Sequence, residues 1–206
     1  MTPASVKSIP STPRRVVLAR HGATAWSKNG RHTGTTDLPL LTEGETEARS
    51  LHRKLSGILG RPGPRLVLTS PLARARDTCR LTGYGDQAVT EDDLAEWDYG
   101  RYEGLTTAEI RAERPGWDLF SDGCPGGEGV REVARRVERV IWRLKVDPSL
   151  RERDALLFAH GHLLRVLAGQ WCGFGIEAGR SLRLETGAVS VLGWSHDNPV
   201  LQHWNL

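Results

Sequence analysis

Two residues near the start of the chain, Arg20 and His21, pair a phosphate-binding side chain with a nucleophile. A guanidinium can hold a phosphate through two parallel hydrogen bonds, and a neutral histidine can attack phosphorus. The pair follows the apolar run 16–19 and precedes Gly22, so it stands where a short buried strand ends. Ligands of open α/β sheets bind at such ends. A structural histidine beside a surface arginine is the alternative at this point.

Two further junctions repeat the pattern. Arg74 lies near the start of a helix that follows the apolar run 66–69, and His160 follows the run 155–159. The N–H groups at a helix N-terminus favour an anion. In a parallel sheet all three junctions share one edge, so two histidines and two arginines can converge on one tetrahedral anion. The sequence therefore predicts a phosphate site at this edge.

A fourth segment, residues 94–104, combines acids, aromatic rings and glycines in a loop-like stretch. Within it, Glu96 is followed directly by Trp97. Burial among apolar rings disfavours an ionised carboxylate, so such an acid can hold a proton and donate it to a leaving alkoxide. A surface loop with an aromatic anchor is the alternative interpretation.

Strand and helix patterns alternate along the chain. Strands are predicted at 15–19, 66–69, 88–90, 155–159, 189–194 and 200–204. Helices are predicted at 42–59, 72–81, 130–144 and 162–171, with a short one that begins at Thr106 and ends before Pro115. Capping boxes are expected at Thr42 with Glu45 and at Thr106 with Glu109. The alternation predicts a three-layer α/β/α sandwich with a mostly parallel central sheet and an antiparallel edge.

Composition limits the classes of protein. The chain has 206 residues, a net charge of +3 and a pI of about 9.0. Its arginines are spread over several segments rather than gathered in a stripe with aromatics, so nucleic-acid binding is not expected. No apolar stretch approaches the ~18 residues of a membrane span. We expect a disordered lead-in at 1–13 and a single domain at 14–206.

The three cysteines, Cys79, Cys124 and Cys172, are an odd number without paired spacing. Neither a disulfide framework nor a cysteine-based zinc site is indicated, and a reducing cytoplasm fits this usage. His160 and His162 could suggest a metal pair, but no third ligand stands at a sensible spacing. We therefore expect no metal.

These segments together resemble the histidine phosphatase superfamily, also called phosphoglycerate mutase-like. The resemblance runs from about Arg14 to Asn205, and the order of its motifs is specific for the family but not for a substrate. The motifs are Arg20-His21-Gly22-Ala23-Thr24, Gly30-Arg31-His32-Thr33-Gly34, Asp37-Leu38-Pro39-Leu40, Ser70-Pro71-Leu72-Ala73-Arg74-Ala75, the stretch 96–104 and His160-Gly161-His162.

The resemblance implies that His21 is the nucleophile, which forms a phosphohistidine, and that Glu96 is the proton donor to the leaving group. Arg20, Arg74 and His160 would complete the phosphate pocket. No cofactor is implied, because guanidinium and imidazole groups stand in for a metal. The substrate side would be lined by Thr24, Ser27, Arg31, His32, Thr33, Gly34, Glu103, Gly161 and His162.

The sequence also departs from the family pattern. Ala23 replaces a glutamate that relatives often carry, and Ser27 stands where asparagine is common. The stretch between Glu96 and His160 is short for a glycolytic mutase, and a shorter cover admits water and varied esters. We therefore expect a metal-independent phosphatase, either a broad-specificity acid phosphatase or a sugar-phosphate phosphatase, that releases inorganic phosphate from a small phosphorylated metabolite.

Alternatives to this function remain. A phosphoglycerate mutase is the second candidate, a non-catalytic phosphate sensor is the third, and a homodimer stays open. Glu128 is a candidate for the mouth of the pocket, and Trp97 and Trp117 are expected near it. The other interpretations concern sets of residues: packing for Trp142, Trp171, Trp194 and Trp204, and a solvated helix face for Arg131, Arg135, Arg136, Arg139 and Arg143.

Overall fold

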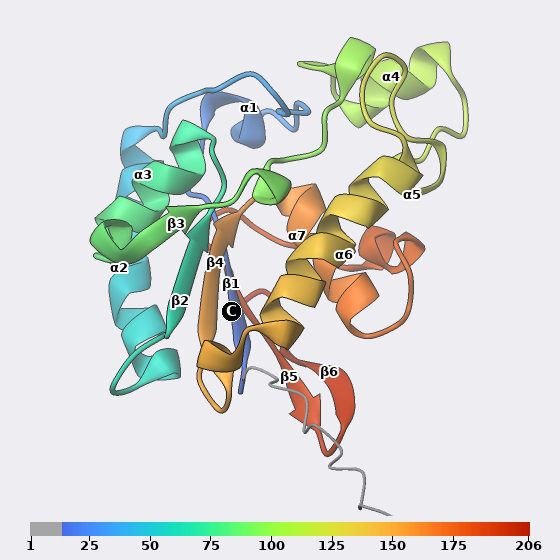
Figure 1. The fold of residues 1–206 in the computed structure, drawn as a ribbon. Helices are drawn as coiled ribbons and strands as arrows, with labels where there is room; N and C mark the ends of the chain where they lie inside the picture. Colours follow the sequence, from blue (N-terminus) through green and yellow to red (C-terminus); the bar gives the residue numbers. More distant parts are fainter. Residues whose placement is uncertain (1–13) are drawn as a thin grey trace, which may run out of the picture.

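The computed structural model describes residues 14–206; the predicted lead-in 1–13 lies outside the described residues. A six-stranded sheet with the order β3-β2-β4-β1-β5-β6 forms the centre (Figure 1). The first four strands in this order run parallel, and the last two add an antiparallel edge. The mostly parallel sheet with an antiparallel edge is therefore confirmed. The strands are β1 (Val16–Arg20), β2 (Leu66–Thr69), β3 (Ala88–Thr90), β4 (Ala155–Ala159), β5 (Val189–Ser195) and β6 (Asn198–His203).

Helices cover both faces of the sheet, as Figure 1 shows. Alternate side chains of β1 point to opposite faces, so Val16 and Leu18 enter one core cluster while Val17 and Ala19 enter the other. Burial on both faces explains why the strand is apolar throughout. The first cluster is shared with α6 (Val130–Val146) and α7 (Gly161–Trp171), and the second with α2 (Thr42–Leu59) and α3 (Ala73–Leu81).

Short helices gather beyond the end of the sheet at which β1 ends (Figure 1). They are the α-helices α1 (Ala25–Lys28), α4 (Thr107–Glu113) and α5 (Leu119–Asp122).

The 3₁₀ turns within residues 14–206 lie in the connections between the other elements. They are η1 (Gly85–Gln87), η2 (Asp92–Leu94), η3 (Gly100–Tyr102), η4 (Pro148–Leu150) and η5 (Glu177–Ser181). Among residues 14–206, no helix combines the length and hydropathy needed to cross a membrane.

One of the two predicted capping boxes is present. Glu109 N donates to Thr106 Oγ1 at 3.2 Å, and Thr106 N donates to Glu109 Oε2 at 2.7 Å. The box at Thr42 is wrong, because Thr42 is already the first residue of α2 and Leu41 is the N-cap. Leu41 N donates to Ala23 O, and α2 itself spans the predicted range 42–59.

The tryptophan predictions need correction. Trp142 is 67% exposed on α6 rather than packed, because Ile141 and Leu144 occupy the buried arc of the helix and position 142 lies outside it. Trp171 is buried as predicted, and the half-buried Trp194 and Trp204 pack against the first core cluster, also as predicted. Trp97 and Trp117 are buried, and their indole N–H groups donate to backbone carbonyls; the ring of Trp117 lies 5.6 Å from that of His32, a candidate site residue.

Candidate active site

The structure brings the three junctions together at one sheet edge. Arg20 pairs with Ala159 across β1 and β4, and Thr69 pairs with Phe158 across β2 and β4. The residue after each of these strands therefore stands beside the others. The rings of His21 and His160 lie 5.2 Å apart between their centroids.

Hydrogen bonding sets the tautomer of His21. Its Nδ1 lies 2.8 Å from Gly22 O, which can only accept, so Nδ1 carries the proton and Nε2 keeps a free lone pair. Burial, and then the charges of Arg20 and Arg74, hold the pKa of His21 well below its ordinary value. The residue is thus a buried, neutral imidazole with its Nε2 unengaged, which is the form that attacks phosphorus.

His160 is held in the opposite tautomer. Its Nδ1 accepts from Arg74 Nε at 3.2 Å, so its Nε2 carries the proton and donates to Ser70 Oγ at 2.7 Å. The side chain is fully buried, and burial, followed by the charge of Arg74, holds its pKa well below the ordinary value. His160 is therefore a fixed, neutral support behind His21.

Arg74 is fully buried and places most of its donors on backbone carbonyls. Its Nη1 donates to Thr36 O at 3.0 Å, and its Nη2 donates to Thr33 O at 2.9 Å and Gly34 O at 3.1 Å. With Nε on His160, only one N–H on Nη1 remains for another acceptor. Arg74 thus links the imidazole of His160 to the loop that contains Thr33.

Arg20 presents an unsatisfied donor. Its Nη1 donates to Leu184 O, but its Nε is buried without a hydrogen-bond partner. A Cβ on Gly161 would lie 3.2 Å from Arg20 Cζ, so glycine at that position lets the guanidinium lie against the start of α7. A buried N–H without an acceptor is costly, and an oxyanion in the cavity would remove that cost.

Glu96 is buried, as predicted, and its carboxyl group rests on the N-terminus of α7. Its Oε1 accepts from Trp97 N at 3.0 Å and Leu163 N at 2.9 Å, and its Oε2 accepts from His162 N at 3.0 Å. Because Oε1 has two donors and Oε2 has one, Oε2 is the oxygen with room for a proton.

A cavity of about 200 Å³ lies among these residues. The predicted site residues that line it are Arg20, His21, Ser27, Arg31, His32, Thr33, Glu96, Gly161 and His162. The predicted residues outside the lining are Thr24, Gly34, Arg74, Glu103 and His160. The lining residues without a predicted role are Gly30, Tyr99, Thr107, Arg165 and Leu184. Of these, Arg165 could have been found from the sequence, because it lies four residues after Gly161, one helical turn further on, and so faces the same side.

Two of the predicted residues outside the lining support the cavity wall. Thr24 caps α1 through a reciprocal box with Ser27. Glu103 accepts from Gly34 N at 2.9 Å and from Thr36 N at 3.1 Å, so it holds the same loop as Arg74 does. Both residues act on the backbone that shapes the cavity.

A cluster of rings forms a neutral wall. Tyr99 Oη lies 2.6 Å from His162 Nδ1, and the His32 ring lies 4.7 Å from Tyr99 and 5.6 Å from His162 between centroids. Burial raises the pKa of Tyr99 well above its ordinary value, so Tyr99 donates and His162 accepts. Burial lowers the pKa of His32 to about 4 and that of His162 well below the ordinary value.

The charges in the cavity are mostly positive. Arg20, Arg31 and Arg165 line it together with one acid, Glu96. Among residues 14–206, no three side chains are grouped as metal ligands. The neutral ring wall and the arginines suit an anionic ligand that carries more than one negative charge.

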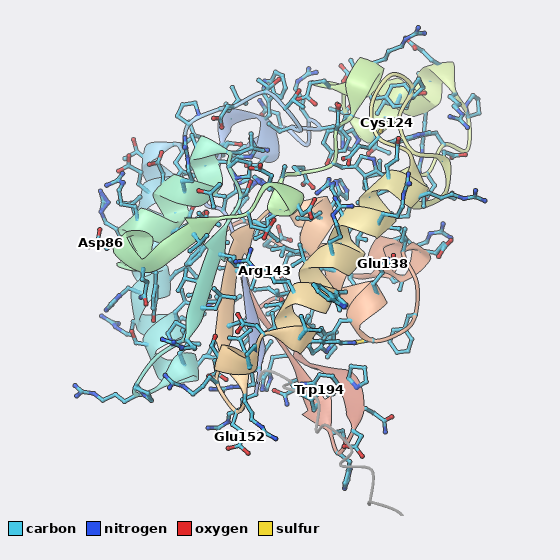
Figure 2. All side chains as sticks on the ribbon, viewed as in Figure 1. Asp86, Cys124, Glu138, Arg143, Glu152 and Trp194 are labelled. Carbon is cyan, nitrogen blue, oxygen red and sulfur yellow. The ribbon has the colours of Figure 1, made fainter. Side chains whose placement is uncertain are left out.

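Two predictions near the cavity are wrong. Glu128 does not line the cavity; its carboxylate pairs with Arg136 at 2.7 and 2.8 Å. Arg136 is buried rather than solvated, because carbonyls of the preceding loop reach it. Arg131, Arg135 and Arg139 are exposed as predicted, and Arg143 is half-buried. Figure 2 shows Glu138 and Arg143 on opposite sides of α6.

A mostly parallel sheet whose strand ends place a neutral histidine and an arginine with a spare donor at one cavity, next to a buried carboxyl group from a loop, suits the transfer of a phosphoryl group. Comparison with known proteins agrees. The family model of the histidine phosphatase superfamily (branch 1) matches residues 16–206, and the chain belongs to this superfamily. It is a phosphoric monoester hydrolase of that family.

The chain is 40% identical to an acid phosphatase of Mycobacterium tuberculosis over 182 residues, which cover 88% of this chain and 87% of the relative. It is 37% identical to sedoheptulose 1,7-bisphosphatase of Saccharomyces cerevisiae, with 82% and 71% covered. The solved structure of a Mycobacterium tuberculosis open reading frame has a TM-score of 0.87 at 35% identity, with 94% and 97% covered. A mycobacterial glucosyl-3-phosphoglycerate phosphatase in complex with VO3 has a TM-score of 0.78 at 30% identity, with 93% and 98% covered.

Proposed function

We propose that the chain hydrolyses small phosphorylated metabolites, sugar phosphates above all, through a phosphohistidine at His21 and without a metal. One observation carries the proposal: the same cavity is lined by His21, a neutral imidazole with a free Nε2, by Arg20, whose buried Nε has no partner, and by Glu96. Nucleophile, oxyanion donor and proton donor are the parts that phosphoryl transfer needs.

The chemistry proceeds in two steps. His21 Nε2 forms a bond to phosphorus as the ester P–O bond breaks, and Glu96 gives its proton to the leaving oxygen. Glu96 then takes a proton from water as the water oxygen bonds to phosphorus. The Nε2–P bond breaks, His21 returns to its neutral form, and inorganic phosphate leaves. Arg20 holds the phosphoryl oxygens throughout, while the remaining N–H of Arg74 and the imidazole of His160 keep the pocket in place.

The charge and size of the cavity support small, strongly anionic esters. Arg165 lines the cavity away from the Arg20–His21 junction in sequence and adds positive charge for the body of the substrate, whereas Arg31 in the lining is paired with Glu109 at 3.2 Å. The relatives are described as acting on sedoheptulose 1,7-bisphosphate and glucosyl-3-phosphoglycerate, both phosphorylated sugar derivatives. These names support a sugar phosphate as the substrate class.

A mutase activity is the second candidate, because the relatives include a 2,3-bisphosphoglycerate-dependent phosphoglycerate mutase of Rhizobium etli, 29% identical over 205 residues. Incubation with 3-phosphoglycerate separates the two. A phosphatase yields glycerate and inorganic phosphate, whereas a mutase yields 2-phosphoglycerate with little free phosphate. A non-catalytic sensor would release no phosphate from any ester.

Removal of metal ions should leave the activity unchanged. The proposed chemistry uses guanidinium and imidazole groups where other phosphatases use a metal. A panel of sugar phosphates, phosphoglycerates and nucleotides is assayed for phosphate release with and without EDTA. Rates within about twofold of each other are expected, since no step draws on a metal. Activity lost in EDTA and restored by added divalent ions would overturn the metal-free proposal.

Activity should persist on the acid side of neutral. An imidazole with the ordinary pKa of about 6.5 is mostly protonated at pH 5 and cannot attack. Because burial and two arginines hold the pKa of His21 well below 6.5, this residue stays neutral there, so the acid limb lies well below pH 6.5. The measurement is kcat/KM against pH; a tenfold loss per pH unit that starts at pH 6.5 on the acid side contradicts it.

The cellular compartment, the oligomeric state and the domain organisation of the chain are predictions. Cys79, Cys124 and Cys172 are free thiols, which supports a reducing cytoplasm. The homodimer and the single domain at 14–206 likewise stay predictions, to be measured by light scattering and by limited proteolysis.

A further inference from the structure

The ion pair of Arg136 and Glu128 lies outside the cavity, and the proposed chemistry does not use it. The Arg136 side chain is 9% exposed and the Glu128 side chain 23%. Arg136 Nε donates to Glu128 Oε1 at 2.7 Å and Nη2 donates to Oε2 at 2.8 Å, so the contact is bidentate. A buried pair of this kind is weak evidence for stability by itself. Its other contacts indicate what it does.

The remaining donors of Arg136 all reach the loop that carries Glu96. Nη1 donates to Asp93 O at 3.0 Å and to Ala95 O at 2.6 Å, and Nη2 donates to Glu96 O at 3.1 Å. Every N–H of the guanidinium is therefore engaged. Only the planar fork of arginine can hold a carboxylate and three carbonyls at once; the ammonium group of lysine has three donors from a single point.

Glu128 binds the same loop from its other end. Its Oε2 accepts from Asp98 N at 2.9 Å, and its backbone N donates to Asp98 O at 2.9 Å. Its carbonyl accepts from Trp97 Nε1 at 2.9 Å. The loop is thus gripped on both sides of Glu96, while the carboxyl group itself rests on N–H groups of α7.

We propose that Arg136 and Glu128 are positioning residues, which fix the backbone of Glu96 so that its carboxyl group can deliver a proton to the leaving group. The proposal rests on the donor role of Glu96 in the proposed function. Proton transfer needs the heavy atoms within hydrogen-bond reach, and a displacement of about 1 Å can cost on the order of 100-fold. Because α6 holds the backbone and α7 holds the carboxyl group, a loosened α6 contact shifts Glu96 relative to His21.

The leaving group distinguishes positioning from general support. p-Nitrophenyl phosphate releases a stable phenolate that needs little protonation, whereas glycerol phosphate releases an alkoxide that needs a proton. We would measure kcat/KM for both esters in Arg136→Lys, Glu128→Gln and Glu96→Gln. Arg139→Lys is the matched control, because Arg139 is an exposed residue of α6 that binds the same loop through the Asp93 carboxylate alone.

With glycerol phosphate, kcat/KM should fall about 100-fold in Glu96→Gln and about tenfold in each of the pair variants Arg136→Lys and Glu128→Gln. Losses of this size lie within the range of general acid catalysis. On p-nitrophenyl phosphate the same variants should change by less than about threefold, since that step needs little proton transfer. Arg139→Lys should leave both values unchanged. Thermal unfolding checks that each variant is folded.

The outcomes separate the two proposals. Suppose that Glu96→Gln loses kcat/KM on glycerol phosphate only, but that both pair variants lower kcat/KM equally for the two esters or leave it unchanged. The positioning role is then overturned, and the donor role stands. If Glu96→Gln lowers kcat/KM equally for both esters, the donor role fails and the inference fails with it. Should Arg136→Lys not fold, Glu128→Gln decides, because it keeps the shape of the side chain and one acceptor oxygen.

Discussion

Replacing His21 with alanine should abolish phosphate release, with a loss of at least about 1,000-fold. The reason is structural. Of the imidazoles grouped around the phosphate site, His21 is neutral and has an Nε2 without a hydrogen-bond partner, whereas Nε2 of His160 is committed to Ser70. No neighbouring imidazole can therefore take over the attack in the same position. The assay is phosphate release from sugar phosphates, together with retention of labelled phosphate on rapidly denatured protein.

The control is His203→Ala, because His203 lies exposed on β6, away from the site. It should match the unmodified chain in rate and in trapped phosphate. The outcome that contradicts the prediction is a His21→Ala protein that still turns over, or one that still retains label after denaturation. Either result would require another nucleophile and would remove the phosphohistidine from the proposed function.

Arg74→Ala should reduce both activity and stability strongly. The substitution leaves the carbonyls of Thr33, Gly34 and Thr36 without their buried donor and releases Nδ1 of His160. Each buried group left unpaired costs roughly 1–3 kcal/mol. Arg74 also ties His160 to the loop that contains Thr33, and a displacement of about 1 Å in the pocket around His21 can cost on the order of 100-fold in rate. We would measure kcat and the midpoint of thermal unfolding on the same preparations.

Arg74→Lys is the matched variant, since it keeps the charge but cannot reproduce the fork that reaches three carbonyls and an imidazole. It should recover little of the activity. If Arg74→Lys were nearly as active as the unmodified chain, charge alone would matter and the hydrogen-bond geometry would not. An Arg74→Ala protein within tenfold of full activity would contradict the prediction altogether.

Much of the scaffold could be predicted, because its signals are local. The apolar runs before His21 and His160 are short and end at glycine-bearing turns, so they predict buried strands whose carboxyl ends carry polar side chains. Parallel strands then place those ends at one edge. The short helix at Thr106 was equally clear, since both partners of its capping box lie within four residues.

Other features could not be predicted from local patterns. Arg136 lies on α6 next to Val137, on the same arc as the apolar residues, yet it was assigned to solvent because its residue type is normally exposed. Its burial depends on carbonyls some forty positions earlier in the chain. Trp142 was assigned to the core for the converse reason, and the phase of the helix places it outside.

The residue types and the short-range patterns thus determined which chemical groups the chain carries and that strand ends would present them together. Only the tertiary structure decided which of those groups still have a donor or lone pair to offer. Arg74 gives its donors to a distant loop, Arg20 keeps one free, and His21 keeps its Nε2. The reason is that a hydrogen-bonding group is satisfied by whichever partner reaches it in space, and those partners come from segments that no local pattern connects.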